Sequence, residues 1–178
     1  MAITHAFVSA IADDVDTTFV RPSNWNADHT IADGTVTTAM LAAIDGTPNT
    51  DHTSNGPNTA TFSAGETVTV MDLVYLKSDG EWWLTDADAA ATAGGVMLAI
   101  SLESKTDGQA MSVALPGSFV RDDTWNWTVG AVLYVGLTAG QITATQPSAT
   151  DDVIRVVGFA VTADVIWFAP SADYATVV

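Results

Sequence analysis

Cysteine is absent from the 178-residue sequence. The chain therefore forms neither a disulfide framework nor a thiolate metal site, and the redox state of its compartment stays undetermined. A chain of this length closes a hydrophobic core without such cross-links, either as one domain or as one domain with an ordered arm. Folding is thus expected to rest on burial of apolar residues.

Basic residues and long apolar runs are both scarce. Five Lys and Arg stand against 21 Asp and Glu, which gives a formal net charge of −16 and opposes contact with phosphate backbones or anionic lipid. No apolar run approaches the roughly 18 residues that a membrane helix needs. We therefore expect neither nucleic acid nor a membrane as partner. The first ten residues also lack a cationic leader, so we expect a protein used without a cleaved signal peptide.

Glutamate is rare among the acids, with 18 Asp against 3 Glu. Abundant Asp, Thr, Ala and Gly disfavour long helices and suit turns and strand ends. Only residues 35–44 predict a short helix, because Met40, Leu41 and Ile44 recur there at helical spacing.

The chain has two regions of different composition. Residues 1–58 are polar and rich in turn-forming residues, and they end in the Pro- and Gly-containing linker DGTPNTDHTSNGPN. Residues 59–178 consist of short apolar runs separated by Gly or Asp, which is typical of an all-β domain. The sequence therefore predicts a compact antiparallel β-sandwich or barrel over 59–178, preceded by an extended, mostly irregular arm and linker over 1–58.

Three tight turns predict hairpins in the β domain: residues 78–80, 138–140 and 162–164. Met111, Val113 and Leu115 alternate with smaller residues, so one face of that strand should meet the core.

The last hairpin has apolar residues on both faces. Val157 and Phe159 are expected on one face and Val156 on the other, and Trp167 and Phe168 follow in an unbroken apolar run. A small antiparallel domain seldom covers both faces of such a strand, so we expect an oligomer contact here. The predicted interface residues are Val157, Phe159, Trp167 and Phe168.

No catalytic residues are predicted. The sequence has no G-x-S-x-G elbow, and its three histidines, His5, His29 and His52, all lie in the N-terminal region. Their spacing is not that of metal ligands on one helix face, and they are expected to be surface or packing residues. We therefore expect no catalytic site, no cofactor and no metal.

Four acidic pairs occur without the pattern of a calcium loop. They are expected to be solvated turn residues and strand caps: Asp13/Asp14, Asp86/Asp88, Asp122/Asp123 and Asp151/Asp152.

Tryptophans are concentrated in the β domain. Exposed pairs of this kind can form a sugar platform or a protein contact, but alternate members of each pair are expected to pack in the core or at a subunit contact. The candidates for surface recognition are Trp82, Trp83, Trp125 and Trp127.

Three stretches resemble structural proteins of tailed bacteriophages. THAFVSAIADDVDTTFVRPSNWNADHT (4–30) resembles an N-terminal segment that recurs in fibre-like and head-associated proteins. Residues 71–100 and 117–170 resemble the C-terminal β module of capsid-decoration and fibre proteins. The resemblance implies a surface-displayed trimer whose N-terminal arm attaches to the particle or to a neighbouring subunit, and it offers no catalytic residues to carry over.

The function expected from these features is capsid decoration. The protein would be a homotrimeric cement protein on the outer surface of the virion, assembled in the host cytoplasm and bound to the major capsid protein or another virion protein. Because no long repetitive shaft follows the β module, decoration is favoured over a complete fibre. The expected docking residues are Phe7, Val8, Phe19, Val20, Arg21 and Trp25, of which Arg21 is the only Lys or Arg among the first 76 residues.

Two other functions stay open. One is a short head or tail fibre that binds a host-surface glycan or receptor through the tryptophans. The other is a depolymerase, which would need paired carboxylates in one cleft.

Overall fold

The computed structural model describes residues 2–3, 29–30, 47–55 and 59–178. The chain divides into two units, residues 1–41 and 42–178. In the first unit, β1 (Ala2–Ile3) pairs antiparallel with β2 (His29–Thr30). The helix expected over 35–44 and the docking residues expected between Phe7 and Trp25 lie outside the described residues.

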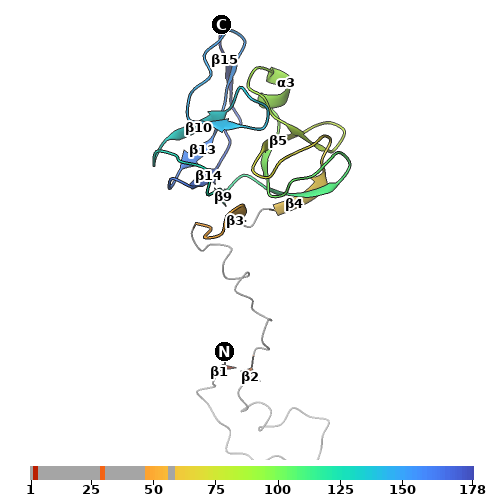
Figure 1. Cartoon of the computed structure of the whole chain (residues 1–178), viewed down its shortest axis with the longest axis vertical. Coiled ribbons are helices and arrows are strands. Elements are labelled where there is room, and N and C mark those ends of the chain that lie inside the picture. Colours follow the sequence, from red (N-terminus) through yellow and green to blue (C-terminus); the bar gives the residue numbers. More distant parts are fainter. Residues whose placement is uncertain (1, 4–28, 31–46, 56–58) are drawn as a thin grey trace, which may run out of the picture. The chain divides into compact units, whose positions relative to one another are not determined.

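The second unit contains two main antiparallel sheets (Figure 1). The first has five strands in the order β4 (Thr59–Ser63), β8 (Ala110–Ala114), β7 (Leu98–Ser101), β5 (Leu73–Leu76) and β6 (Trp82–Leu84). The second has six strands in the order β11 (Ile142–Thr143), β10 (Val132–Val135), β13 (Val156–Ala160), β14 (Val165–Phe168), β9 (Ser118–Arg121) and β3 (Thr53–Asn55). A small ladder joins β12 (Val153–Ile154) to β15 (Ala175–Thr176).

The predicted all-β class is confirmed for the described residues. Each of the three expected turns joins a pair of hydrogen-bonded antiparallel strands: β5–β6, β10–β11 and β13–β14. One short helix, α3 (Ala90–Ala93), is described. This helix was not predicted from the sequence, although the consecutive alanines Ala89–Ala91 favour helix.

The central strands of the five-stranded sheet are buried on both faces. Side chains of β5, β7 and β8 alternate between two hydrophobic cores, so that Leu73 lies in one core and Val74 in the other. A bridge between Ala64 and Trp82 joins the β4 end of this sheet to β6, so the sheet curls towards a closed barrel. The smaller core fills its interior: Ala64, Val68, Val74, Trp82, Ala99, Met111 and Val113.

The larger core lies between the two sheets. It joins β5 and β7 of the first sheet, through residues such as Leu73 and Ile100, to the inner face of the second sheet, represented by Leu133, Ile166 and Phe168. The expected inward face of β8 is confirmed, since Met111 and Val113 are fully buried and Leu115 packs against the same core.

The β domain begins earlier than the expected boundary at residue 59. Residues Thr53–Asn55, assigned to the linker from sequence, form β3 at one edge of the six-stranded sheet and pair with β9. Their low hydrophobicity gave no strand signal, because an edge strand with half-buried side chains needs little apolar character.

A β-bulge changes the predicted faces of the last hairpin. Leu133 and Tyr134 of β10 pair with Gly158 and Val156, so Val157 is the extra residue on β13. The expectation that Val157 and Phe159 share a face is therefore wrong: Val157 points into the core and Phe159 points out. Val157 and Phe168 are fully buried within this chain, which leaves Phe159 and Trp167 as the surface members of the predicted interface.

Candidate functional site

A cavity of about 330 Å³ lies where three loops of the β domain meet. The segment before β5 contributes Val70, Met71 and Asp72, the segment after β9 contributes Asp122, Trp125 and Trp127, and the β10–β11 turn contributes Gly140, Gln141 and Ile142. Its lining combines indole rings with carboxylates and one amide. Aromatic surface with a few polar groups is typical of small-molecule binding sites.

Backbone hydrogen bonds position the two indoles. Trp125 N donates to Asp122 O at 3.1 Å, and Trp127 N donates to Ala163 O at 2.9 Å. The ring centroids are 5.8 Å apart with the planes inclined at 52°. Both side chains are half-buried against the larger core, so the rings are held in place while part of each stays accessible.

Asp72 brings a carboxyl group with an altered pKa to the cavity. Burial raises the pKa of Asp72 above its ordinary value, the nearby Glu66 raises it further, and the hydrogen bond from Thr69 N, 2.7 Å from Oδ2, opposes the rise. A side chain at position 140 would run into this carboxyl group, so Gly140, with φ +80°, suits both the turn and the close approach.

The other two predicted recognition tryptophans do not line this cavity. Trp82 is fully buried in the smaller core, where Phe62 meets its ring edge-on at 5.9 Å, so its predicted role in surface recognition is wrong. Trp83 is half-buried, and Lys77 Nζ lies 3.4 Å from its ring centroid. The register of β6 determines which of the two tryptophans is buried in the smaller core. Two consecutive tryptophans in the sequence do not reveal that register.

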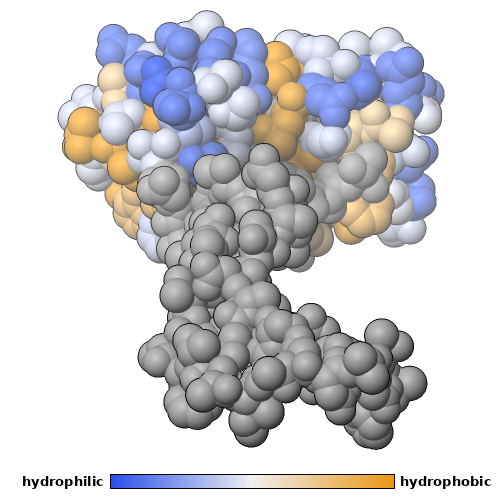
Figure 2. Space-filling model, turned by 90° about the horizontal axis from the view of Figure 1, so that it is seen from below, coloured by the Kyte–Doolittle hydropathy of each residue, from blue (hydrophilic) through white to orange (hydrophobic). Residues whose placement is uncertain are grey.

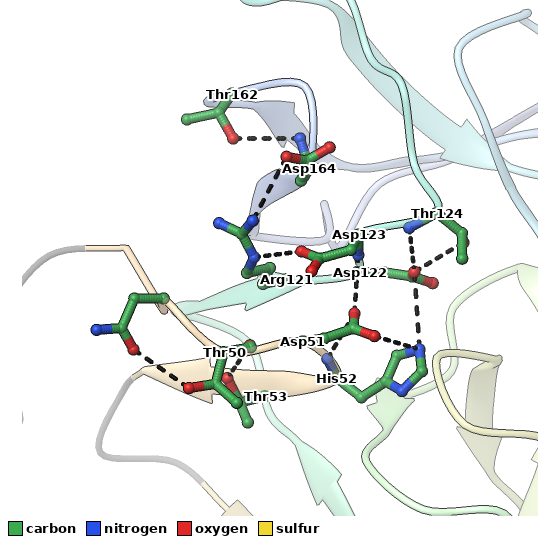
Figure 3. A network of polar contacts seen from close by, with 11 residues as sticks. Thr50, Asp51, His52, Thr53, Arg121, Asp122, Asp123, Thr124, Thr162 and Asp164 are labelled. Carbon is green, nitrogen blue, oxygen red and sulfur yellow. Dashed lines mark hydrogen bonds and ion pairs between the residues drawn. The ribbon is translucent and has the colours of Figure 1, made fainter.

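A polar network lies beside the cavity, around the junction of β3 and β9 (Figure 3). His52 Nε2 lies 3.5 Å from Asp51 Oδ2 and 3.7 Å from Asp122 Oδ1. Arg121 pairs with Asp123 at 2.5 Å and with Asp164 at 3.6 Å. The sequence does not indicate this cluster, because His52 and Asp122 lie 70 positions apart.

In the three described acidic pairs, Asp86, Asp122 and Asp152 accept backbone hydrogen bonds in turns as expected, but Asp122 and Asp152 are not solvated. Asp122 is only 6 % exposed and Asp152 only 5 %. Asp122 Oδ1 accepts hydrogen bonds from Thr124 N and Oγ1, and Asp152 Oδ2 accepts one from Ala149 N at 2.8 Å. These bonds replace the lost solvation. Asp13 and Asp14 lie outside the described residues.

A row of apolar side chains crosses the outer face of the six-stranded sheet. Val132 pairs with Phe159, Phe159 with Trp167, and Trp167 with Phe119, so the row spans β10, β13, β14 and β9. Phe159 and Trp167 are stacked, with centroids 6.3 Å apart, and remain 40 % and 42 % exposed. We call these four residues the outer row.

No family model, no curated protein and no solved structure matches this chain. The resemblance to phage structural proteins therefore stays a prediction. No helix in the described part of the chain is long and apolar enough to cross a membrane.

Proposed function

We propose that this chain is a non-enzymatic structural protein of a tailed-phage particle, and specifically a decoration protein that binds the outside of the capsid and stabilises it. The outer row is the observation that carries the proposal. It places large apolar side chains on the surface of a domain whose charge is strongly negative. Such a patch marks a protein contact, because exposed aromatic rings gain most from exclusion of water.

The outer row suits a contact between copies of the chain. Its four side chains come from four adjacent strands, so they form a rigid surface that loses little conformational entropy on association. The most exposed members, Phe159 and Trp167, belong to the predicted interface. We propose that they meet the same domain of neighbouring copies in a trimer with closed symmetry.

The charge of the described domain supports a partner that is a protein rather than a nucleic acid. The domain holds four of the five Lys and Arg residues, and each is engaged within the chain. Lys77 pairs with Asp79, Lys105 with Glu103, and Arg121 with Asp123 and Asp164, while Arg155 donates to backbone carbonyls. The Lys and Arg side chains that would neutralise phosphates are thus already paired within the chain.

Attachment to the shell is assigned to the N-terminal arm. Arg21 and Trp25 supply a charge-assisted contact and a large apolar anchor. In this arrangement the arm binds the capsid, the outer row holds the trimer together, and the acidic surface faces solvent.

Substituting alanine for both Phe159 and Trp167 is expected to convert the trimer into a monomer. Each ring is a central anchor, and loss of such an anchor weakens association by at least about 30-fold. Multi-angle light scattering measures the mass, and sedimentation with shells that lack this protein measures occupancy, which should fall because three linked arms bind more tightly than one.

The matched control is Leu137→Ala, which removes another exposed apolar side chain outside the outer row and should leave both readings unchanged. Arg21→Ala and Trp25→Ala should lower occupancy without changing the mass. The proposal fails if the wild-type chain does not bind shells, and the role of the outer row fails if the wild-type chain is monomeric both free and bound.

A second function, recognition of a host-surface glycan, is favoured by the cavity between Trp125 and Trp127. Sugar rings pack their C–H faces on indoles, while carboxylates and amides accept and donate hydrogen bonds to hydroxyls. The volume lies at the lower end of the ~300–1,000 Å³ usual for ligand pockets, which suits one saccharide unit. Asp72 and Asp122 would disfavour acidic sugars.

Trp127→Ala is therefore expected to weaken binding of neutral oligosaccharides at least about tenfold, since it removes one of the two rings. A glycan array with confirmation by titration calorimetry measures this effect. Trp83→Ala, which changes a tryptophan outside the cavity, should bind as the wild type does. Wild-type binding that is unaffected by Trp127→Ala would exclude this cavity as the glycan site.

A further inference from the structure

His52 faces two carboxylates that come from distant parts of the sequence. Asp51 and His52 precede the edge strand β3, and Asp122 directly follows β9. Pairing of β3 with β9 brings these residues together, and one potential ligand atom from each lies within 4.8 Å of the others. Figure 3 shows the imidazole directed towards both carboxylates.

The spacing of these atoms fits a shared cation better than direct hydrogen bonds. His52 Nε2 lies 3.5 Å from Asp51 Oδ2 and 3.7 Å from Asp122 Oδ1, whereas an N–H···O bond measures about 2.7–3.2 Å. Ligands bound at about 2.0–2.2 Å around a tetrahedral zinc ion lie roughly 3.4 Å from one another. Both distances from His52 Nε2 are thus close to the spacing of ligands around such an ion, and the two carboxylates lie within 4.8 Å of each other.

The charges around Asp122 also call for a cation. Asp122 is 6 % exposed, and its ion-pair partner among the described residues is His52. The adjacent Arg121 pairs with Asp123 and Asp164 instead. The hydrogen bonds from Thr124 offset part of the cost of burying this carboxylate, and a bound cation would balance its charge.

The carboxylates are already held in orientation, as ligands of a built site are. Asp51 Oδ1 accepts hydrogen bonds from His52 N at 3.0 Å and from Asp123 N at 2.8 Å, which leaves Oδ2 directed at the imidazole. Asp122 is fixed by Thr124 N and Oγ1 at 2.8 and 2.7 Å. The side chains of Asp51 and His52 are about 40 % exposed, so an ion can reach the site from solvent.

We propose that Asp51, His52 and Asp122 bind a transition-metal dication of the Zn²⁺ class, which clamps β3 to the turn after β9. One imidazole and two carboxylates suit such an ion, and water completes a tetrahedral shell. Ca²⁺ and Mg²⁺ fit less well because they prefer oxygen ligands throughout. β3 has three residues and a single neighbouring strand, so a cross-link here strengthens the point where the chain from the N-terminal region joins the β domain.

The test uses the full chain, treated with chelator and then titrated with Zn²⁺ by calorimetry, with thermal melts in parallel. The wild type should bind one Zn²⁺ and melt at a higher temperature with the ion than without it. Asp51→Asn preserves an acceptor at Oδ1 but removes the charged ligand, and His52→Gln removes the imidazole. Each substitution should weaken Zn²⁺ binding by at least about tenfold.

Co²⁺ gives a second reading that does not depend on stability. In the wild type it should produce the strong visible absorption of a four-coordinate ion, and both substitutions should abolish that band. His29→Gln is the matched control, since it removes a histidine that is not one of the three proposed ligands and should leave both readings unchanged. Zn²⁺ binding that is equal in the wild type and His52→Gln, or a response to Ca²⁺ with none to Zn²⁺, would overturn the proposal.

Discussion

Replacing Arg155 with methionine is expected to lower the free energy of unfolding by about 4 kcal/mol, because three backbone carbonyls lose their donor. The side chain is 4 % exposed. Its Nε donates to Ser171 O at 2.9 Å, and its Nη1 donates to Ala93 O at 3.0 Å and to Gly94 O. One guanidinium thereby ties the end of α3 to the segment that precedes β15.

Burial also explains why an arginine occupies this position. Desolvation lowers the pKa of Arg155, yet a guanidinium remains protonated and its planar donors can satisfy several acceptors at once. Lysine would keep the charge but lose this geometry, so Arg155→Lys should recover only part of the stability.

Chemical denaturation at neutral pH measures these differences. Arg121→Met is the matched control, because it removes an arginine whose partners lie on the surface, and its cost should stay below about 1 kcal/mol. Equal costs for the two methionine variants would show that the buried hydrogen bonds of Arg155 contribute nothing beyond a surface pair.

Replacing Gly158 with alanine is expected to cost about 3 kcal/mol, through steric overlap and backbone strain. Gly158 has a φ of +157°, and a Cβ atom there would overlap the carbonyl oxygen of Trp167 on the adjacent strand. Relief of that overlap would require β13 and β14 to separate or the bulge to shift. The loss should appear in the free energy of unfolding and in weaker stacking of Phe159 on Trp167.

Gly108→Ala separates the backbone strain from the steric overlap that both contribute to the cost of Gly158→Ala. Gly108 has a φ of +76° in an open turn, and a Cβ atom there would have no neighbour within 4 Å. Only backbone strain applies, so the cost should be about 1 kcal/mol. An equal cost for Gly158→Ala and Gly108→Ala would show that the close approach of β13 and β14 adds nothing to the backbone strain.

The sequence predicted the features that depend on neighbouring residues. Turn residues located three hairpins, and the alternation of Met111 and Val113 located a core face. Both signals are local, since a few consecutive residues determine a tight turn or the alternation of apolar side chains along a strand. The fold class followed from repetition of these signals along the β domain.

Features that depend on long-range pairing were not predicted. The face of Phe159 depends on a bulge, and a glycine within an apolar strand was the available warning. The burial of Trp82 rather than Trp83 depends on strand register. The approach of His52 to Asp122 depends on pairing between β3 and β9, and nothing in the spacing of those residues indicates it.

Hydrophobic residues on the drawn face of the β domain reach the surface in patches separated by hydrophilic ones (Figure 2). Apolar residues in a strand therefore do not by themselves mark a subunit contact. Of the four residues predicted there, Val157 and Phe168 serve the core of one chain, and the outer row now contains the other two.

The burial of the central strands of the five-stranded sheet on both faces bears on how the domain melts. Strands β5, β7 and β8 contribute alternate side chains to the two cores, so the two cores share these strands. Melting of either core would expose one face of these strands to water, and the packing of the other core against their opposite face would then weaken. The two cores should therefore behave as one cooperative unit, and the barrel should not persist as a partly folded state after the six-stranded sheet has separated from it.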